Sequence, residues 1–159
     1  LYYNHLNTGR PLKESKWFTK FTSNYLDIDN DPLYPFGYGL SYTTFKYGKP
    51  TLSSNTMTNN ETISVSVDIT NTGNYDADEI AQMYIRDLAA SVSRPVKELK
   101  GFERISIKKG ETKTVTFTIT PEDLKFYNQE LEYKNEPGEF EVMVGPNSKD
   151  VQTLTFTLK

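Results

Sequence analysis

The 159-residue chain contains no cysteine, one histidine and one tryptophan. Without cysteine, neither a disulfide nor a thiolate metal site can support the fold, and cysteine pairing gives no sign of the redox compartment. A Ser-His-Asp triad or a two-histidine metal site would have to use the single ring of His5. We therefore interpret His5 as an ordinary surface or interface residue.

The chain also lacks a long apolar run and a strong excess of either charge. No run approaches the about 20 apolar residues that a membrane-spanning helix needs, so we expect no membrane span. The formal net charge of −3 argues against a general binder of nucleic acid. Since neither an initiator Met nor a basic-then-apolar leader stands at Leu1, we expect a piece of a longer protein.

What the chain does contain is strict alternation of polar and apolar side chains. In residues 62–70 every second position is apolar and β-branched: Ile63, Val65, Val67 and Ile69. A period of two is typical of a strand with one buried face, whereas a helix would scatter these side chains around its circumference. A sheet with one apolar face needs a second apolar layer, so this strand predicts a two-layer architecture.

Other strands are expected where alternation returns between turn signals. In residues 79–87 we expect an inward and an outward set: Ala81, Met83 and Ile85 against Gln82, Tyr84 and Arg86. The remaining expected strands lie at 41–47, 112–120 (Val115, Phe117 and Ile119 inward), 125–127, 131–133, 140–144 and 154–158. This spacing predicts an all-β, immunoglobulin-like sandwich of about seven strands.

Glycine and proline indicate where these strands bend or end. Gly101, in the middle of residues 96–107, predicts a β-bulge or a crossing between sheets. Thr120 and Pro121 predict one turn of helix, because threonine caps helices and proline suits the first helical position. We expect residues 53–60 to form a polar turn.

The first third of the chain is different. Residues 1–31 show no strand or helix period, yet they carry too many large apolar side chains for a flexible linker, so we expect them to pack on a partner surface. Residues 32–45 are the densest aromatic segment; Pro32 and Pro35 exclude a helix. We expect an irregular N-terminal extension that crosses into the first strand.

One acidic cluster has the spacing of a calcium loop. Asp27, Asp29 and Asp31 match the first, third and fifth loop positions, but Pro32 stands where the loop requires glycine. Tyr38 stands where a bidentate glutamate belongs. We predict no metal site and no cofactor.

The other charged groups have ordinary structural explanations. The basic residues of 94–113 are interpreted as solvated strand edges, because only Phe102 is available among them for base stacking. Acid–base catalysis needs a buried carboxyl with a raised pKa, and the spacing of the acidic pairs selects no such group: Glu130 and Glu132, Glu139 and Glu141. We therefore predict no catalytic residue in this chain.

Exposed rings are the remaining route to function. Tyr34, Phe36, Tyr38 and Tyr42 would form either a sugar-stacking platform or an apolar contact between domains. We favour the contact between domains, because bends at proline and glycine point the rings in several directions.

Four runs stand out along the chain: 32–45 (PLYPFGYGLSYTTF), 67–73 (VDITNTG), 94–105 (RPVKELKGFERI) and 138–145 (GEFEVMVG). In this order they resemble the C-terminal fibronectin type III-like domain of family 3 glycoside hydrolases, the β-glucosidase family. Upstream, residues 2–5 and 8–11 resemble the tail of that family's α/β sandwich domain.

The resemblance implies a parent enzyme that removes terminal β-linked glucose or xylose with retention of configuration. In the family, an aspartate nucleophile and a glutamate acid/base belong to upstream domains, and neither motif occurs here. The implied division is 1–31 as the tail of the preceding domain and 32–159 as the fibronectin type III-like domain. The implied partners are the catalytic domains and, for the parent, a β-linked oligosaccharide or glycoside; periplasmic or secreted location is also implied.

We predict that this piece is a non-catalytic brace for the catalytic domains. The side chains expected at the contact between domains are Trp17, Tyr34, Phe36 and Tyr38. The alternative is an accessory module that binds carbohydrate through its exposed rings.

Overall fold

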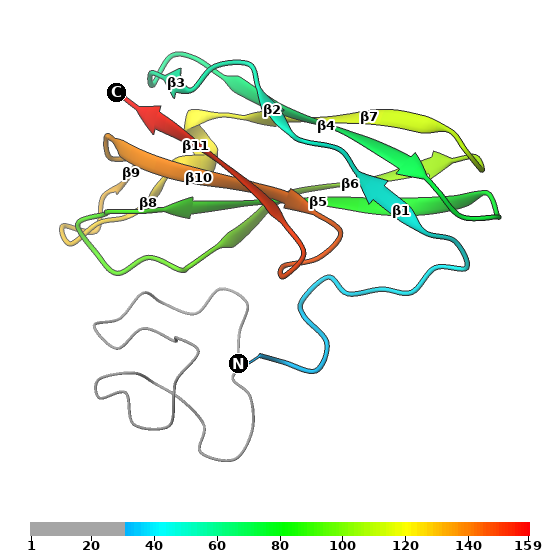
Figure 1. The fold of residues 1–159 in the computed structure, drawn as a ribbon. Coiled ribbons are helices and arrows are strands. Elements are labelled where there is room, and N and C mark those ends of the chain that lie inside the picture. Colours follow the sequence, from blue (N-terminus) through cyan, green and yellow to red (C-terminus); the bar gives the residue numbers. More distant parts are fainter. Residues whose placement is uncertain (1–30) are drawn as a thin grey trace, which may run out of the picture.

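The computed structural model describes residues 31–159, which form two sheets packed face to face (Figure 1). The four-stranded sheet is built around β4 (Ile63–Asn71), the strand expected from strict alternation. β7 (Thr112–Ile119) pairs with one side of β4. β1 (Phe45–Tyr47) and β2 (Thr51–Leu52) pair with its other side, and all three pairings are antiparallel.

The five-stranded sheet forms the second layer. Its strands lie in the order β3 (Thr56–Met57), β11 (Gln152–Leu158), β10 (Gly138–Gly145), β5 (Ala77–Asp87) and β6 (Glu98–Ile107). β3 runs parallel to β11, and the other neighbours are antiparallel. Within the described part, seven strands have three or more residues, which confirms the predicted all-β sandwich of about seven strands.

A short 3₁₀ helix and a hairpin connect the two sheets. The helix spans Pro121–Leu124, as predicted, and the carboxylate of Asp123 accepts hydrogen bonds from the backbone N–H and the hydroxyl of Thr120 (2.8 and 2.7 Å). β8 (Phe126–Tyr127) and β9 (Tyr133–Lys134) follow as an antiparallel pair. Leu124 and Phe126 bury their side chains, so the connection is packed on the sandwich.

The core lies between the sheets and contains the side chains that alternation assigned to it. Ile63, Val65, Val67 and Ile69 are all buried, and Ile69 is fully so. The core also includes Ala81, Met83, Ile85, Val115, Phe117, Ile119, Phe140, Val142, Val144, Phe156 and Leu158. Because apolar burial contributes about 25 cal/mol per Å², this continuous layer is the main stabilising feature.

β6 contains the expected irregularity. Its register against β5 shifts between Met83 and Tyr84, so Lys100 has no partner residue there, and the bulge lies beside Gly101. A Cβ atom at Gly101 would stand 3.2 Å from the ring of Phe117, so the close packing also favours glycine. β6 stays in the five-stranded sheet throughout, which confirms the bulge and excludes a crossing between sheets.

Two local expectations were wrong. The first strand was expected from residue 41, but it begins at Phe45, because Phe45 already pairs with Asn71, the last residue of β4. The polar turn at 53–60 contains the short strand β3, whose carbonyl at Met57 accepts a hydrogen bond from the N–H of Lys159 (2.9 Å). β3 thereby covers the outer edge of β11.

Candidate functional site

The predicted aromatic segment lies outside the sandwich core and is largely exposed. We define it as residues 32–42, which run along the β5–β10 side of the sandwich before β1 (Figure 1). The exposed fractions of its rings are 64% for Tyr34, 45% for Phe36, 45% for Tyr38 and 95% for Tyr42. Exposed rings in such number are typical of a contact surface.

A tight turn organises the middle of the aromatic segment. The N–H of Tyr38 donates to the carbonyl oxygen of Pro35 (3.0 Å), and Gly37, at the third turn position, has φ +79°. A positive φ at this position belongs to the type II turn, which favours glycine. A Cβ atom at Gly37 would stand 2.0 Å from Oε1 of Gln82, so both the backbone and the space require glycine.

Side chains and backbone of the five-stranded sheet hold this turn in place. Nε2 of Gln82 donates to the carbonyl oxygens of Gly37 (3.1 Å) and Pro146 (2.6 Å). The hydroxyl of Tyr84 donates to Oε1 of Gln82, which fixes the amide orientation. The backbone N–H of Ser148 donates to the carbonyl oxygen of Phe36 (2.9 Å). The turn is therefore attached to β5 and to the β10–β11 connection at once.

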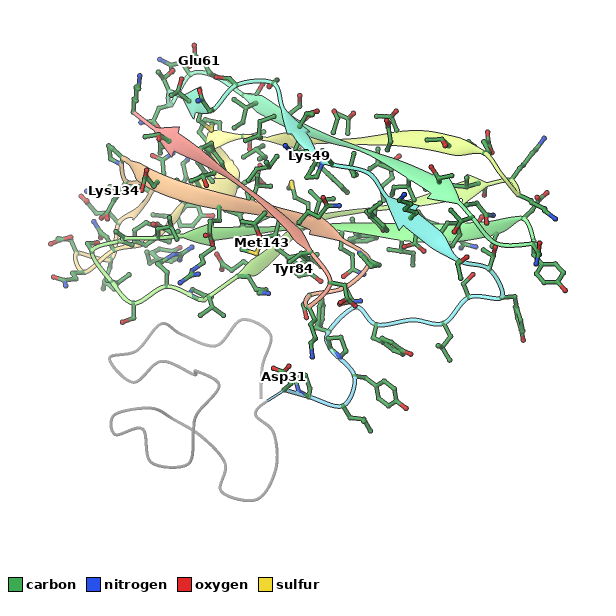
Figure 2. The ribbon with its side chains drawn as sticks, viewed as in Figure 1. Asp31, Lys49, Glu61, Tyr84, Lys134 and Met143 are labelled. Atoms are coloured by element: carbon green, nitrogen blue, oxygen red, sulfur yellow. The ribbon has the colours of Figure 1, made fainter. Side chains whose placement is uncertain are left out.

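These contacts change the expected environment of β5. Gln82 and Tyr84 point away from the core, as alternation predicts, but both are buried, and Tyr84 is fully so. Tyr84 lies opposite Met143 of β10, and Figure 2 labels both on the side from which the chain enters at Asp31. The outward orientation of Gln82 and Tyr84 is thus confirmed, and the outer face of the five-stranded sheet carries a second, smaller buried layer that alternation alone does not indicate.

Lysine side chains fix the β10–β11 connection that holds the turn. Nζ of Lys97 donates to the carbonyl oxygen of Ser148 (2.6 Å). Burial lowers the pKa of Lys97, Arg86 lowers it further, and Glu141 partly compensates. Nζ of Lys149 forms an exposed ion pair with Asp31 (2.7 Å). The β10–β11 connection is therefore held by Lys97 of the β5–β6 connection and carries Lys149, which pairs with Asp31.

The rings do not form a flat platform. The centroids of Tyr34 and Tyr38 are 5.0 Å apart and their planes are inclined by 38°. A sugar-stacking shelf needs several rings in one plane, whereas tilted rings suit an irregular apolar partner. The geometry therefore favours a contact between domains over a carbohydrate platform.

Among residues 31–159, two carboxyl groups have a raised pKa, those of Glu79 and Asp87. Burial raises the pKa of Glu79, and hydrogen bonds from the hydroxyl of Tyr47 (2.8 Å) and a backbone N–H oppose it. Burial also raises the pKa of Asp87, opposed by the N–H of Ala89 and the charge of Arg94. Each of these two carboxylates thus accepts a hydrogen bond from a nearby donor, Tyr47 for Glu79 and Ala89 for Asp87. Among residues 31–159, no group of three or more metal-ligating side chains occurs.

The remaining residues named from the sequence are acidic side chains, His5 and Trp17. Glu130 and Glu132 are exposed, and Lys134 lowers the pKa of Glu132. Asp31 is paired with Lys149, whereas His5, Trp17, Asp27 and Asp29 lie outside the described residues. The division between 1–31 and 32–159 stays a prediction.

Sequence reasoning missed three polar side chains that organise this region. Gln82 and Lys97 attach the aromatic segment and the β10–β11 connection. The guanidinium of Arg94 lies 4.4 Å from the ring centroid of Phe126 and pairs with Glu98 (2.8 Å), so it fastens the β8–β9 hairpin. The one available signal was glutamine at a position flanked by apolar residues in β5.

Comparisons with known proteins agree with this architecture. Residues 79–148 match the family described as Fibronectin type III-like domain. The chain is 53% identical, over 99% of its length, to a periplasmic beta-glucosidase of Salmonella typhimurium, and 51% identical, over 94%, to a putative beta-xylosidase of Formosa agariphila. The crystal structure of a beta-glucosidase from Listeria innocua in complex with gluconolactone superposes with a TM-score of 0.92, at 44% identity over 99% of this chain.

The relatives are much longer than this chain. It spans 20% of the Salmonella typhimurium and Formosa agariphila proteins and 22% of the Listeria innocua chain. Within residues 31–159, no helix is long and apolar enough to cross a membrane.

Proposed function

The chain carries a domain of the fibronectin type III-like family, and from this premise we propose that it is the non-catalytic brace of a longer β-glycosidase. The longer protein is a family 3 hydrolase that releases terminal β-linked glucose or xylose with retention. Its relatives include proteins named beta-glucosidase and beta-xylosidase, of which this chain matches about a fifth.

The chemistry of retention supports a role outside catalysis. A retaining glycosidase needs two carboxyl groups about 5–5.5 Å apart, one as nucleophile and one as acid/base. In residues 31–159, the carboxyls with a raised pKa are Glu79 and Asp87, and each accepts a hydrogen bond within its own domain. The reacting carboxylates therefore belong to the upstream domains.

The observation that carries the proposal is the anchored aromatic segment. Its turn is held by Gln82 and Ser148, yet Tyr34, Phe36 and Tyr38 remain exposed around it. Exposed apolar surface on a rigidly held segment is stabilised by a partner surface, because burial contributes about 25 cal/mol per Å². The catalytic domains of the same chain are the partner. The location is periplasmic or secreted, as the name of the Salmonella typhimurium protein suggests.

Hydrolysis assays test this proposal. The full-length protein and the 159-residue chain are each incubated with aryl β-glucoside and aryl β-xyloside, and release of the aryl group is measured. We expect release of the aryl group by the full-length protein and none above background by the chain. Turnover by the chain alone would contradict the non-catalytic role.

Affinity electrophoresis of the chain in gels containing β-glucan tests the alternative. A brace migrates at the same rate with and without glucan. Retardation by glucan would instead favour a carbohydrate-binding module, for which the most exposed ring, Tyr42, is the first residue to substitute.

A further inference from the structure

The two outer faces of the sandwich differ in chemistry. On the four-stranded sheet, β4 and β7 alternate hydroxyl or carboxyl groups outward, and these pair across the strands: Ser66 with Thr116 (2.8 Å), Thr70 with Thr112 (2.7 Å) and Asp68 with Thr114. None of the exposed large apolar side chains of residues 31–159 belongs to these two strands. The outer face of the four-stranded sheet is therefore expected to stay exposed to solvent.

The outer face of the five-stranded sheet carries apolar side chains on β5, β6 and β10, beside threonines of β11 and glutamates of β10. Tyr84 and Met143 are buried on it, and the same face continues to Ile80 of β5 and Phe102 of β6. Phe102 is 69% exposed and Ile80 is 48% exposed. These two large apolar side chains lie on neighbouring strands of one face and together form a patch. An isolated exposed apolar side chain would not form one.

This patch is continuous with the aromatic segment. Phe102 lies directly across the strand pair from Gln82, the residue that holds the carbonyl of Gly37. Residues directly opposite in an antiparallel pair have their side chains about 4.5–5.5 Å apart on the same face. The turn at Gly37 and the ring of Phe102 therefore lie on either side of Gln82, on the same outer face.

Charged pairs border the patch. Arg104, opposite Ile80, donates from Nε to Asp78 (2.7 Å), and Arg86 pairs with Glu141 across β5 and β10 (3.5 Å). An apolar centre with a polar border is the usual composition of a protein–protein contact.

The path of the chain leads to the same face. Asp31 is paired with Lys149 on the β10–β11 connection, next to Ser148, which holds the turn. Figure 2 labels Asp31 on the side of Tyr84 and Met143. The described part of the chain therefore begins beside the β10–β11 connection.

We propose that Phe102 and Ile80 extend the docking surface of the aromatic segment, so that the upstream domains of the same protein cover the outer face of the five-stranded sheet. The four-stranded sheet keeps its hydroxyl-lined face in water. This inference rests on the proposed function, and it adds a second contact, on β5 and β6, that lies about 45 to 65 residues from the aromatic segment in sequence.

Thiol labelling of the full-length protein tests this surface. The variants are Phe102→Cys and, as a matched control, Tyr75→Cys, since Tyr75 is equally exposed in the domain (63%) but lies in the β4–β5 connection. Labelling by a maleimide is followed by peptide mass spectrometry, which reports each position separately. We expect position 102 to react about tenfold or more slowly than position 75 in the folded protein, and equally fast in denaturant.

Equal rates in the folded protein would overturn the inference. If Phe102→Cys does not fold, as judged by circular dichroism, Ile80→Cys replaces it with the same expected protection. Thr116→Cys, on the opposite outer face, is expected to react as fast as Tyr75→Cys. A slow reaction at position 116 would show that the four-stranded sheet is covered instead, and it would contradict the inference. The labelling rates do not depend on activity, so a folded but inactive full-length protein would contradict the proposed function alone.

Discussion

At the scale of single residues, buried polar side chains close the ends of the sandwich. Asn71 is fully buried and ends β4, where its Nδ2 donates to the carbonyls of Tyr75 (2.7 Å) and Ile107 (3.0 Å). Its Oδ1 accepts from the hydroxyl of Thr43 (2.7 Å) and the N–H of Gly73 (3.1 Å). One side chain thus joins both sheets and the β4–β5 turn.

We predict that Asn71→Ala destabilises the 159-residue chain by about 2–4 kcal/mol, because it leaves buried donors and acceptors without partners. Urea unfolding measures the effect as a lower midpoint with an unchanged slope. The control is Asn74→Ala in the same turn, where the side chain is exposed and the expected change is within about 0.5 kcal/mol. Equal effects of the two variants would contradict the proposed network.

The folding stability of the chain is expected to depend on pH through Glu79, which accepts a hydrogen bond from Tyr47. Burial raises the pKa of Glu79 in the folded state, and burial followed by the charge of Glu79 raises the pKa of Tyr47. A folded carboxyl with a raised pKa holds its proton more tightly than the unfolded chain does. Its contribution to stability is therefore fully present below the unfolded pKa, about 4.3, and is lost as the pH rises through the folded pKa.

We expect Glu79→Gln to remove this contribution, so that the variant gains less stability than the original chain when the pH falls from 7 to 4. Urea midpoints measured across that range test the expectation. Asp87, whose pKa is also raised, keeps its own contribution in both proteins. In Tyr47→Phe, loss of the hydrogen bond from the hydroxyl should raise the pKa of Glu79 further, as measured by carbon NMR titration; a lower pKa would refute the assignment.

At the scale of elements, the turn at Pro35–Tyr38 is the part of the aromatic segment whose position is fixed by contacts with the five-stranded sheet. Its glycine has a positive φ and faces Gln82 closely, whereas Gly39, two residues on, has no such φ and open space at its Cβ position. The turn also contacts Gln82, whose Oε1 accepts a hydrogen bond from the hydroxyl of Tyr84, so the turn is linked to the outer layer of β5.

We predict that Gly37→Ala destabilises the chain by about 1–3 kcal/mol, through strain in the backbone and loss of the Gln82 contact. Thermal unfolding followed by circular dichroism measures the shift. Gly39→Ala is the matched control and should leave the melting temperature unchanged or slightly higher. A turn that tolerated alanine at 37 as well as at 39 would show that Gln82 does not hold it.

At the scale of the whole molecule, the two outer faces of the sandwich differ in their exposed apolar side chains, which occur on β5 and β6 but not on β4 and β7. The aromatic segment, Phe102 and Ile80 lie on the apolar side, and the hydroxyl pairs of β4 and β7 lie on the other. This asymmetry agrees with the proposed brace, in which the upstream domains would cover the side that carries the aromatic segment.

We predict that Tyr34→Ala lowers the melting temperature of the full-length protein, with a loss of about 1–3 kcal/mol for one large side chain removed from an interface. Differential scanning calorimetry measures the shift. Tyr75→Ala, with the same exposure in the domain, should change it little. Equal shifts for the two variants would argue against bracing through the aromatic segment.

The amino-acid sequence by itself determined the all-β class, the strand at Ile63–Asn71, an irregularity at Gly101 and the helical turn at Pro121, whereas the tertiary structure decided that the irregularity is a bulge. These features depend on neighbours within a few residues, because alternation and turn chemistry act locally. The exposure of the aromatic segment was also predictable, since its prolines and glycines exclude regular structure.

Only the tertiary structure decided that Gln82 and Tyr84 are buried on the outer side of β5. The contacts of Gln82 come from Gly37, 45 residues earlier, and from Pro146, 64 residues later, and alternation along one strand carries no information about such distant contacts. Tertiary structure likewise decided which outer face is apolar, because Phe102 joins the patch only through its register with Gln82.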